Sequence, residues 1–542
     1  MKEKRLPLLL LYLIPFLLLI VFFYVPVINV FINGFSGQGL SQVLEDSYCR
    51  RTAIFSIKQG VLSTLLSAII GFPGAYILSK YTFPGKGFLK ALITVPFVLP
   101  PIAAVLGIVL LAGNNGLINR ALMAISGSSQ PKLQILYSLK AILIAHTFYN
   151  IPLFIRFVYP VWEKIPTSLY EAGRSLGAGK ARLFRTVTLP WLLPCITAAC
   201  ALIFVECFMS FSIVLVLGGG PQFSTMEVEI YKLARTTAQI PKACALGAAE
   251  TLIAMVFITI YTAAGHRSTG YSVSADSNRH PVLKKLSGTA GLPALIYVVF
   301  LFLYVALPMV TITLNSFTGN GRWGQDGGLT FRWYQAFSQS IMYRPVLNTL
   351  LIAIGTVSAA IILSLLIASA ISRWPEGSFL IQIFFFASLG ISSILLGLGY
   401  LITISKLGWR PNGKLLLVAV HTAAVLPFTI KAISLFYSRM NRRCIECAQS
   451  LGAKPLRILW TVKLPMIKNG IFTAGIFAFA VSAGEVNGAL MLAPKGFTTM
   501  PVAIYRLIEA YRLYQACAMG TVLLLICIAA FYAIDRLGEI SL

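Results

Sequence analysis

The stretch EAGRSLGAGKARLFRTVTLP, from Glu171 to Pro190, decides the organisation of this chain. It is a polar, basic segment between two long apolar segments, and a related stretch, ECAQSLGAKPLRILWTVKLP, runs from Glu446 to Pro465. The offset is constant, because 446 − 171 and 465 − 190 are both 275. When the alignment is extended back by 25 residues without a gap, 14 of 45 residues are identical. A repeat of this length predicts a chain built from two related halves.

The composition is that of a membrane protein. Of the 542 residues, 57% are hydrophobic and 11% are charged, whereas a soluble protein carries about 25% charged residues. Repeated apolar runs of about 20 residues predict membrane-spanning helices. The net charge of +27 does not indicate a nucleic-acid partner, since the Lys and Arg residues lie in short segments between the apolar runs. The positive-inside rule predicts that distribution.

We expect an all-α polytopic membrane protein made of two homologous six-helix bundles. The expected spans are residues 7–31, 55–79, 90–112, 137–160, 190–217, 243–265, 289–316, 345–371, 378–404, 414–437, 466–492 and 516–535. Three prolines in the third span predict a broken or kinked helix. The expected division is a first repeat (1–265), a polar cytoplasmic linker (266–288) and a second repeat (289–542).

The basic segments predict which side of the membrane each part occupies. An even number of spans in each half places both polar stretches, the linker and both termini on one side. These segments carry the basic clusters, so the positive-inside rule predicts that this side is the cytoplasm. The first apolar run is too long for a signal peptide, and no small-residue cleavage site follows it. We therefore expect an uncleaved first span.

The two polar stretches resemble the EAA loop of ABC importer permeases. That pattern has Glu-Ala-Ala at its start, a central Gly and a closing Leu-Pro. The matching residues are Glu171, Ala172, Leu176, Gly177 and Ala178 in the first copy, and Glu446, Leu451, Gly452 and Ala453 in the second. Gly173 and Cys447 depart from the pattern. Two copies in one chain resemble the fused permeases of ferric-iron and thiamine importers.

This resemblance implies the type I ABC importer transmembrane fold in a bacterial inner membrane. It also implies that residues 161–190 and 438–465 are coupling loops, each docked in a groove of an ATP-hydrolysing partner. Two loops imply two copies of that partner, which would use ATP and Mg, and a separate extracytoplasmic protein would deliver the solute. The alternative for each loop is an amphipathic helix that only lies at the membrane surface.

The chain itself is expected to be a transport subunit and not an enzyme. Three Gly-Lys pairs occur, but none is followed by the Ser or Thr with which a phosphate loop holds magnesium. No nucleophile–base set and no metal-ligand spacing is visible either. We therefore expect no catalytic residue, bound cofactor or metal site, and we expect membrane lipid but no nucleic acid as a partner.

Ionisable residues inside apolar spans indicate a transport pathway by default. We name Glu206, Ser210, Glu485 and Asn487, all in the fifth span of a half, as candidate pathway residues. Counted with an offset of 274, Glu485 corresponds to Phe211, so the two carboxylates are not equivalent. The alternative for each carboxylate is a helix-to-helix hydrogen bond to Ser, Asn or His, and this is the interpretation we favour.

Two histidines, His146 and His421, match across the repeat in the fourth span. We expect them to make structural hydrogen bonds. Residues 145–156 (AHTFYNIPLFIR) and 210–231 (SFSIVLVLGGGPQFSTMEVEIY) look like the first half of thiamine-importer permeases. The resemblance favours thiamine or its phosphates as cargo, with ferric iron as the alternative. An ion-coupled secondary transporter, using Glu206 or Glu485 as a cation site, is a third hypothesis.

Overall fold

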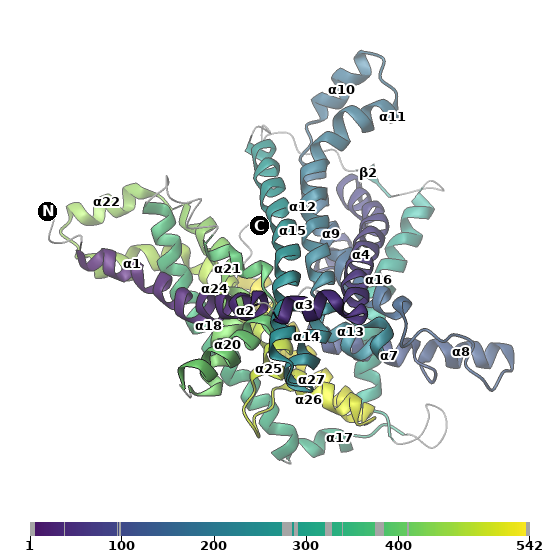
Figure 1. Ribbon diagram of the computed structural model, residues 1–542. Coiled ribbons are helices and arrows are strands. Elements are labelled where there is room, and N and C mark those ends of the chain that lie inside the picture. Colours follow the sequence, from purple (N-terminus) through teal and green to yellow (C-terminus); the bar gives the residue numbers. More distant parts are fainter. Residues whose placement is uncertain are drawn as a thin grey trace. The chain divides into compact units, whose positions relative to one another are not determined.

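The computed structural model describes residues 6–36, 38–94, 96, 99–273, 284–286, 291–319, 328–338, 340–373, 384–408, 411–438 and 440–537. Most of these residues lie in helices, as Figure 1 shows, which confirms the all-α class. The contacts divide the chain into two compact units. The first-half unit comprises Ser41–Lys232 and Ala249–Asn315, and the second-half unit comprises Met1–Leu40, Leu233–Ala248 and Ser316–Leu542.

The predicted spans agree in order with the helices observed, and most of them agree in position. In the described part of the chain, eleven helices are long and apolar enough to cross a membrane, and one bent pair raises the number to as many as twelve. The bent pair is the ninth span, in which Phe384–Gly390 meets Ser393–Leu407 at 106°. The sequence predicted one continuous helix there. The hydroxyl of Ser392 accepts from the N–H of Leu395, so the bend ends in a helix N-cap.

The predicted third span, residues 90–112, does not form one helix. Its beginning falls in α5 (Lys86–Leu92) and its end in α7 (Pro101–Ala112), and the candidate span found there runs from Pro101 to Ser126. Pro101 stands in the first turn of α7, where its missing N–H has no helical partner to lose. The carbonyl of Pro100 accepts from the N–H groups of Ala103 and Ala104, which starts the new helix.

The first-half unit is built around three packed helices. The unit's elements, besides α5 and α7, are α4 (Ser47–Lys80), β1 (Tyr81–Thr82), α8 (Leu117–Ser126), α9 (Leu139–Glu163), α10 (Thr167–Ser175), α11 (Lys180–Leu183), η2 (Phe184–Thr188), α12 (Leu189–Phe208), α13 (Ser212–Leu217), η3 (Pro221–Phe223), β2 (Lys284–Lys285) and α16 (Leu292–Ser316). Two further helices, α14 (Met226–Arg235) and α15 (Ile240–Val273), have residues in both units. Helices α4, α9 and α12 pack on one another and bury Phe154, Trp162 and Ile203 between them.

The second-half unit has the same kind of three-helix centre. Its elements are α1 (Leu6–Leu19), η1 (Ile20–Tyr24), α2 (Val25–Phe35), α17 (Arg332–Gln335), η5 (Ala336–Ser338), α18 (Ser340–Arg373), η6 (Ala387–Gly390), α20 (Ser393–Leu407), α21 (Gly413–Ser438), α22 (Arg442–Ser450), α23 (Pro455–Ile458), η7 (Leu459–Lys463), α24 (Leu464–Gly484), α25 (Asn487–Leu492), α26 (Met500–Glu509) and α27 (Leu513–Leu537). α3 (Gln38–Glu45) begins in this unit and ends in the other. Helices α18, α21 and α24 form the centre, as α4, α9 and α12 do in the first-half unit.

The first span of each half packs in the unit made mostly of the other half. In the second-half unit, Tyr24 of η1 donates its hydroxyl to the carbonyl of Phe384 at 2.7 Å. In the first-half unit, Tyr297 of α16 donates to the carbonyl of Ile70 at 2.6 Å. The division at residues 265 and 289 therefore describes repeats in the sequence, while the packing groups the two first spans differently.

The predicted linker, residues 266–288, lies partly outside the described residues. Helix α15 continues through its beginning as far as Val273. Within the described part, Lys284 and Lys285 form β2, which pairs in parallel with β1. The basic residues before Leu6, used to orient the chain, also lie outside the described residues.

One π-helical turn precedes each of three X-Pro pairs. The turns η1, η2 and η7 are each followed by one residue and then by Pro26, Pro190 or Pro465. A proline inside a helix lacks an N–H and clashes with the carbonyl four residues before it. A π turn is wider than an α turn. In it, the N–H of the residue before the proline bonds to the carbonyl five residues earlier, as Leu189 does to Phe184. The two polar stretches therefore run into their next spans without a break.

Candidate functional site

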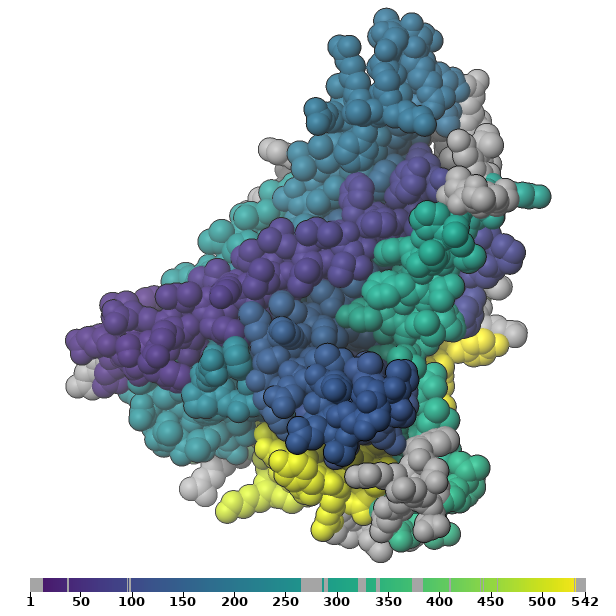
Figure 2. All heavy atoms as spheres, turned by 90° about the vertical axis from the view of Figure 1, so that its right-hand side faces the viewer, coloured from purple at the N-terminus to yellow at the C-terminus, as the bar shows by residue number. Residues whose placement is uncertain are grey.

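Each polar stretch folds into two short helices joined at its central glycine. In the first-half unit these helices are α10 and α11, which project beyond the end of α12 in Figure 1 and protrude at the top of Figure 2. In the second-half unit, α22 and α23 repeat this arrangement. The central glycine of each stretch, Gly177 or Gly452, lies at the bend between the two helices.

The bend is a helix-ending motif that requires glycine. Gly177 and Gly452 have φ angles of +76° and +77°, in the left-handed region that favours glycine. The N–H of Ala178 donates to the carbonyl five residues earlier at 2.9 Å, and the N–H of Ala453 does the same at 3.0 Å. This is the Schellman pattern, which satisfies carbonyls at the end of the helix. The Leu-Gly-Ala centre therefore forms a rigid turn.

The rigid turn holds an apolar side chain out in the open. Leu176 is 85% exposed and Leu451 is 88% exposed. Glu171 and Glu446, one turn earlier, are exposed as well. A leucine that touches so little of its own chain, beside an exposed carboxylate, is available for contact with another protein.

The departure at Gly173 has a packing reason. A Cβ atom placed on Gly173 would lie 2.4 Å from Cδ2 of Leu183, the buried residue of α11. The second stretch has Ala448 at the same position and Ile458 in place of Leu183. The first loop therefore uses glycine to bring its two helices together, and the second loop reaches the same shape with a different pair of side chains.

The fifth span of each half is interrupted near its end. Helix α12 ends at Phe208 and α13 begins at Ser212, while α24 ends at Gly484 and α25 begins at Asn487. Helices α13 and α25 have the same length and an offset of 275, since 487 − 212 = 275. The offset becomes 274 only at α14 and α26, since 500 − 226 = 274.

The equivalence taken from the sequence is therefore wrong by one residue. The one-residue deletion lies between α13 and α14, after the interruption, so Glu485 corresponds to Ser210 and not to Phe211. The conclusion that Glu206 and Glu485 are not equivalent remains correct. Two of the four candidate pathway residues now prove to occupy the same position in the two halves.

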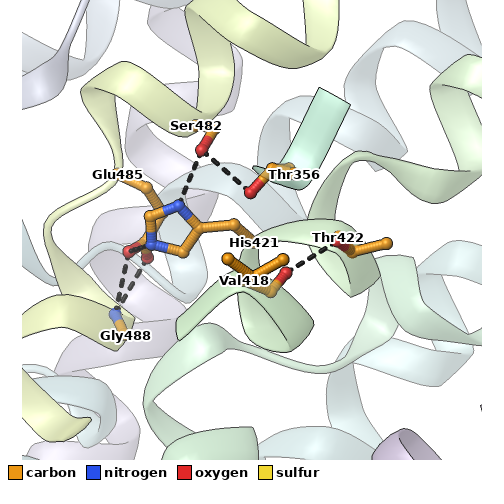
Figure 3. Close-up of polar contacts among 7 residues, drawn as sticks. All are labelled: Thr356, Val418, His421, Thr422, Ser482, Glu485 and Gly488. Atoms are coloured by element: carbon orange, nitrogen blue, oxygen red, sulfur yellow. Dashed lines mark hydrogen bonds and ion pairs between the residues drawn. The ribbon is translucent and has the colours of Figure 1, made fainter. Parts of the chain in front are cut away.

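Glu485, at the interruption, is held by residues of two helices (Figure 3). Its side chain is 9% exposed, and Oε2 lies 3.0 Å from Nε2 of His421 on α21. Both carboxylate oxygens accept from the N–H of Gly488 in α25, at 2.9 Å and 3.1 Å. The favoured alternative placed each carboxylate against a polar residue of another helix. Glu485 does lie against His421 of α21, while its recorded hydrogen bonds come from the N–H of Gly488.

The other ring nitrogen of His421 completes a polar chain across the unit. Nδ1 lies 2.8 Å from Oγ of Ser482 on α24, and that hydroxyl lies 3.3 Å from Oγ1 of Thr356 on α18. His421 is 1% exposed, so these bonds replace water that the ring would otherwise have. The structural role expected for His421 is confirmed.

His146 makes a shorter polar chain in the first-half unit. Its Nδ1 lies 2.9 Å from Oγ of Ser63 on α4, which confirms the structural hydrogen bond expected for it. His146 is 2% exposed, and no described residue bonds its Nε2. Ser210 stands where Glu485 stands in the other half.

The remaining candidates differ in their surroundings. Glu206 is exposed on α12 and makes no hydrogen bond or ion pair with a described residue, so the helix-to-helix hydrogen bond favoured for it is not found. Ser210 is 8% exposed, and its carbonyl accepts from the hydroxyl of Thr225 at 3.0 Å. Asn487 is half-buried at the first position of α25. All four candidates lie within about one helical turn of the interruption.

The sequence did not reveal Thr356, Ser482 and Gly488. A serine and a threonine inside apolar spans carry no signal by themselves, since they also bond to their own helix. The one available clue was Gly488, three residues after Glu485 in an otherwise apolar helix. A Cβ atom there would lie 3.3 Å from Oε2 of Glu485 and 2.8 Å from Cγ1 of Val420.

Comparisons with known proteins agree with this geometry. The family model described as binding-protein-dependent transport system inner membrane component matches residues 64–267. The thiamine transport system permease protein ThiP of Brucella abortus is 28% identical over 91% of this chain and 88% of its own length. The same protein of Salmonella typhimurium is 26% identical over 99% and 98%. The ferric transport system permease protein FbpB of Actinobacillus pleuropneumoniae is 24% identical over 96% and 77%.

The helical fold and the duplicated projecting loops agree with these matches: along most of its length the chain is similar to permease subunits of binding-protein-dependent transport systems, and its apolar helices fit a multi-pass membrane protein. Along nearly its whole length it is similar to the thiamine permeases of the ferric-iron and thiamine group.

Proposed function

We propose that this chain is the membrane-spanning subunit of an ATP-driven importer of thiamine or its phosphates. The single observation that carries the proposal is the pair of projecting loops, each presenting an exposed leucine, Leu176 or Leu451, from a rigid Schellman turn. Two such surfaces at one sequence offset suit two copies of one partner. That partner would bind and hydrolyse ATP with Mg, and this chain would bind neither.

The two loops would transmit the motion of the ATPase to the helices. Each loop continues through a π turn into α12 or α24 without a break. Force on the exposed turn would therefore act directly on the span whose interruption holds Ser210 or Glu485. In the first-half unit, the Tyr170 hydroxyl lies 2.8 Å from Oγ1 of Thr188, which ties α10 to this connection.

The candidate pathway residues support a route for solute near the two interruptions. Glu206 adds an exposed carboxylate within an apolar span, which is costly unless it serves transport. Glu485 is already bonded to His421 and Gly488, so its contribution would be to shape the route. Ser210 and Asn487 would add polar groups beside it. A cationic cargo such as thiamine suits an exposed carboxylate.

The cargo assignment is supported by the names of the relatives. The thiamine permeases match over about nine-tenths of their length, and the ferric permease over less. Ferric iron is the second candidate on the strength of that match. In either case a separate extracytoplasmic protein would bind the solute and deliver it to the face opposite the loops, and both termini would lie in the cytoplasm.

A reconstituted system tests the coupling role. The double variant Glu171→Lys, Glu446→Lys should lose co-purification of the ATPase and at least tenfold of ATP-driven uptake into vesicles. Lys132→Glu, an exposed charge reversal outside the loops and the spans, serves as the control and should retain both. Unchanged uptake by the double variant would contradict the coupling role. Uptake driven by a pH gradient without ATP would favour the secondary transporter.

The cargo is tested separately. The extracytoplasmic binding protein that stimulates this system is purified from cells, and its bound small molecule is identified by mass spectrometry. Thiamine or a thiamine phosphate is the expected ligand. Ferric iron instead would overturn the cargo assignment while leaving the ABC importer assignment in place.

A further inference from the structure

We propose that a groove in the second-half unit, between the first span and helices α18 and α21, binds one acyl chain of a membrane phospholipid. The groove has a volume of about 200 Å³. Leu18 and Phe22 of the first span form one wall, Ala359 and Leu363 of α18 a second, and Ala419 and neighbouring residues of α21 a third. All of these residues belong to one unit, and the groove does not involve the coupling loops.

The described lining of the groove has almost no group that could hydrogen-bond to water or to a polar solute. Among the described residues that line it, Thr422 alone carries a polar side chain. Its hydroxyl donates to the carbonyl of Val418 at 2.6 Å, as Figure 3 shows, so it is already satisfied within α21. A water molecule needs two to four polar partners to occupy a buried site. The occupant must therefore be apolar.

Small side chains create the space. Ala359 and Ala419 are half-buried and face the first span where larger residues would close the gap. Beside them, Phe22 and Phe23 belong to the π turn η1. This turn is anchored from the other side, because the carbonyl of Phe22 accepts from the hydroxyl of Tyr400 and Tyr24 bonds to Phe384. These contacts prevent the first span from collapsing onto α18 and α21.

The position of the groove identifies the occupant. Its edge includes Leu18, 39% exposed, and Leu415, 52% exposed, which both belong to membrane-spanning helices. The medium around such residues is hydrocarbon, so acyl chains are the apolar molecules present at the highest concentration. An empty groove would forfeit van der Waals contacts on its walls. An apolar cavity of about 150 Å³ already accepts a benzene molecule, so this one has room for several methylene groups.

The consequence is a lipid that supports the attachment of the first span. This inference rests only on the spans being in a membrane, and it does not depend on the cargo or on the ATPase. Thr422 lines the groove and follows His421 directly in the sequence. An acyl chain between α1 and α21 would therefore lie against the residue next to His421. Removal of the lipid is therefore expected to loosen the first span before it affects the centre of the unit.

The test fills the groove by substitution. Ala359→Phe places a ring in the space proposed for the acyl chain, and Ala419→Leu does so from α21. Ile362→Phe, on the same helix but 59% exposed and outside the groove, is the matched control. Each protein is purified in mild detergent, and its bound phospholipid is counted by native mass spectrometry. Thermal midpoints are measured with and without added phospholipid.

We expect wild type and Ile362→Phe to retain one more phospholipid per chain than either filled variant. Added phospholipid should raise the thermal midpoint of the first two and leave that of the filled variants unchanged. Equal phospholipid retention by all four proteins would overturn the proposal. Retention of detergent alone by the wild type, with no stabilisation by phospholipid, would overturn it as well. The second filled variant keeps the test decisive if the first fails to fold.

Discussion

The two units each surround the buried histidine of the fourth span with polar groups, but they do so with different residues. In the second-half unit, His421 bonds to Ser482 and lies against Glu485. In the first-half unit, His146 bonds to Ser63, and Ser210 replaces the carboxylate. The histidines are equivalent in sequence and are both buried. They differ in that Nε2 of His421 lies 3.0 Å from a carboxylate oxygen of Glu485, whereas no described carboxylate lies against Nε2 of His146.

The difference teaches that a repeated histidine does not imply a repeated site. The carboxylate in the second-half unit depends on Gly488, because a side chain there would meet Val420 and Glu485. The first-half unit has Ile213 at that position, which is 7% exposed and fills the space. A carboxylate and a glycine therefore belong together, and the first half has neither. In the second half a carboxylate, Glu485, contacts the histidine, whereas in the first half the side chain of Ile213 fills the corresponding space.

The largest effect is expected from Glu485→Ala, which removes the carboxylate that contacts His421 in the second-half unit. It leaves His421 and the N–H of Gly488 buried without their partner. Breaking a buried pair in this way costs about 3–5 kcal/mol of unfolding free energy. Denaturant unfolding in detergent measures the loss. Glu206→Ala, which removes a carboxylate without a described partner from the other fifth span, should cause no comparable loss. Equal losses in the two variants would contradict the asymmetry.

A smaller effect is expected from Gly488→Ile, which gives the second half the residue of the first. The new side chain must displace Val420 and the carboxylate. Overpacking of this kind costs about 1–3 kcal/mol. Gly87→Ala provides the glycine control, since a Cβ atom there meets nothing within 4 Å. A Gly488→Ile protein as stable as the wild type would show that the Glu485 side chain can adopt another conformation without loss of stability.

A further test introduces the glutamate and the glycine of the second half at the equivalent positions of the first half, Ser210 and Ile213. We expect Ser210→Glu to destabilise the protein because Ile213 occupies the space beside the new carboxylate. Adding Ile213→Gly opens that space and lets the carboxylate approach Nε2 of His146. The double variant should therefore be about 0.5–3 kcal/mol more stable than the sum of the two single changes predicts. Strict additivity in this double-mutant cycle would mean that the surroundings of the two histidines are not equivalent in shape.

The smallest effect is expected where the two projecting loops differ. Gly173→Ala puts a methyl group against Leu183, whose side chain can rotate away at a cost of about 0.5–1.5 kcal/mol. The loop should tilt slightly, and uptake should fall without loss of folded protein. Gly179→Ala has open space at its Cβ position and should leave uptake unchanged. Thermal unfolding and vesicle uptake, measured together on both variants, test this expectation.

Much of the architecture was predictable because the signals are local. Apolar runs of about 20 residues identify spans without any knowledge of what packs against them. Gly177 and Gly452 identified the bends, since few other residues adopt their backbone conformation. The long-period repeat aligned the loops and predicted their shared shape. The third-span prolines predicted its interruption for the same reason, because their effect on a helix is covalent.

The candidate site was only partly predictable because its partners are distant in the chain. Glu485 and His421 were both noted, yet their contact joins residues 64 positions apart. The one-residue error in equivalence arose because a deletion between α13 and α14 leaves no mark in the hydrophobic pattern. The bend in the ninth span was missed because no proline marks it.

The sequence by itself determined the class of protein, the number and order of spans, and the two projecting loops, because each depends on composition or on conformations that single residues impose. Only the tertiary structure decided that the first spans pack in opposite units, that Glu485 pairs with His421, and that no described carboxylate pairs with His146. These features depend on which side chains meet across several helices, and hydrophobic periodicity records that a face is buried without recording what it is buried against.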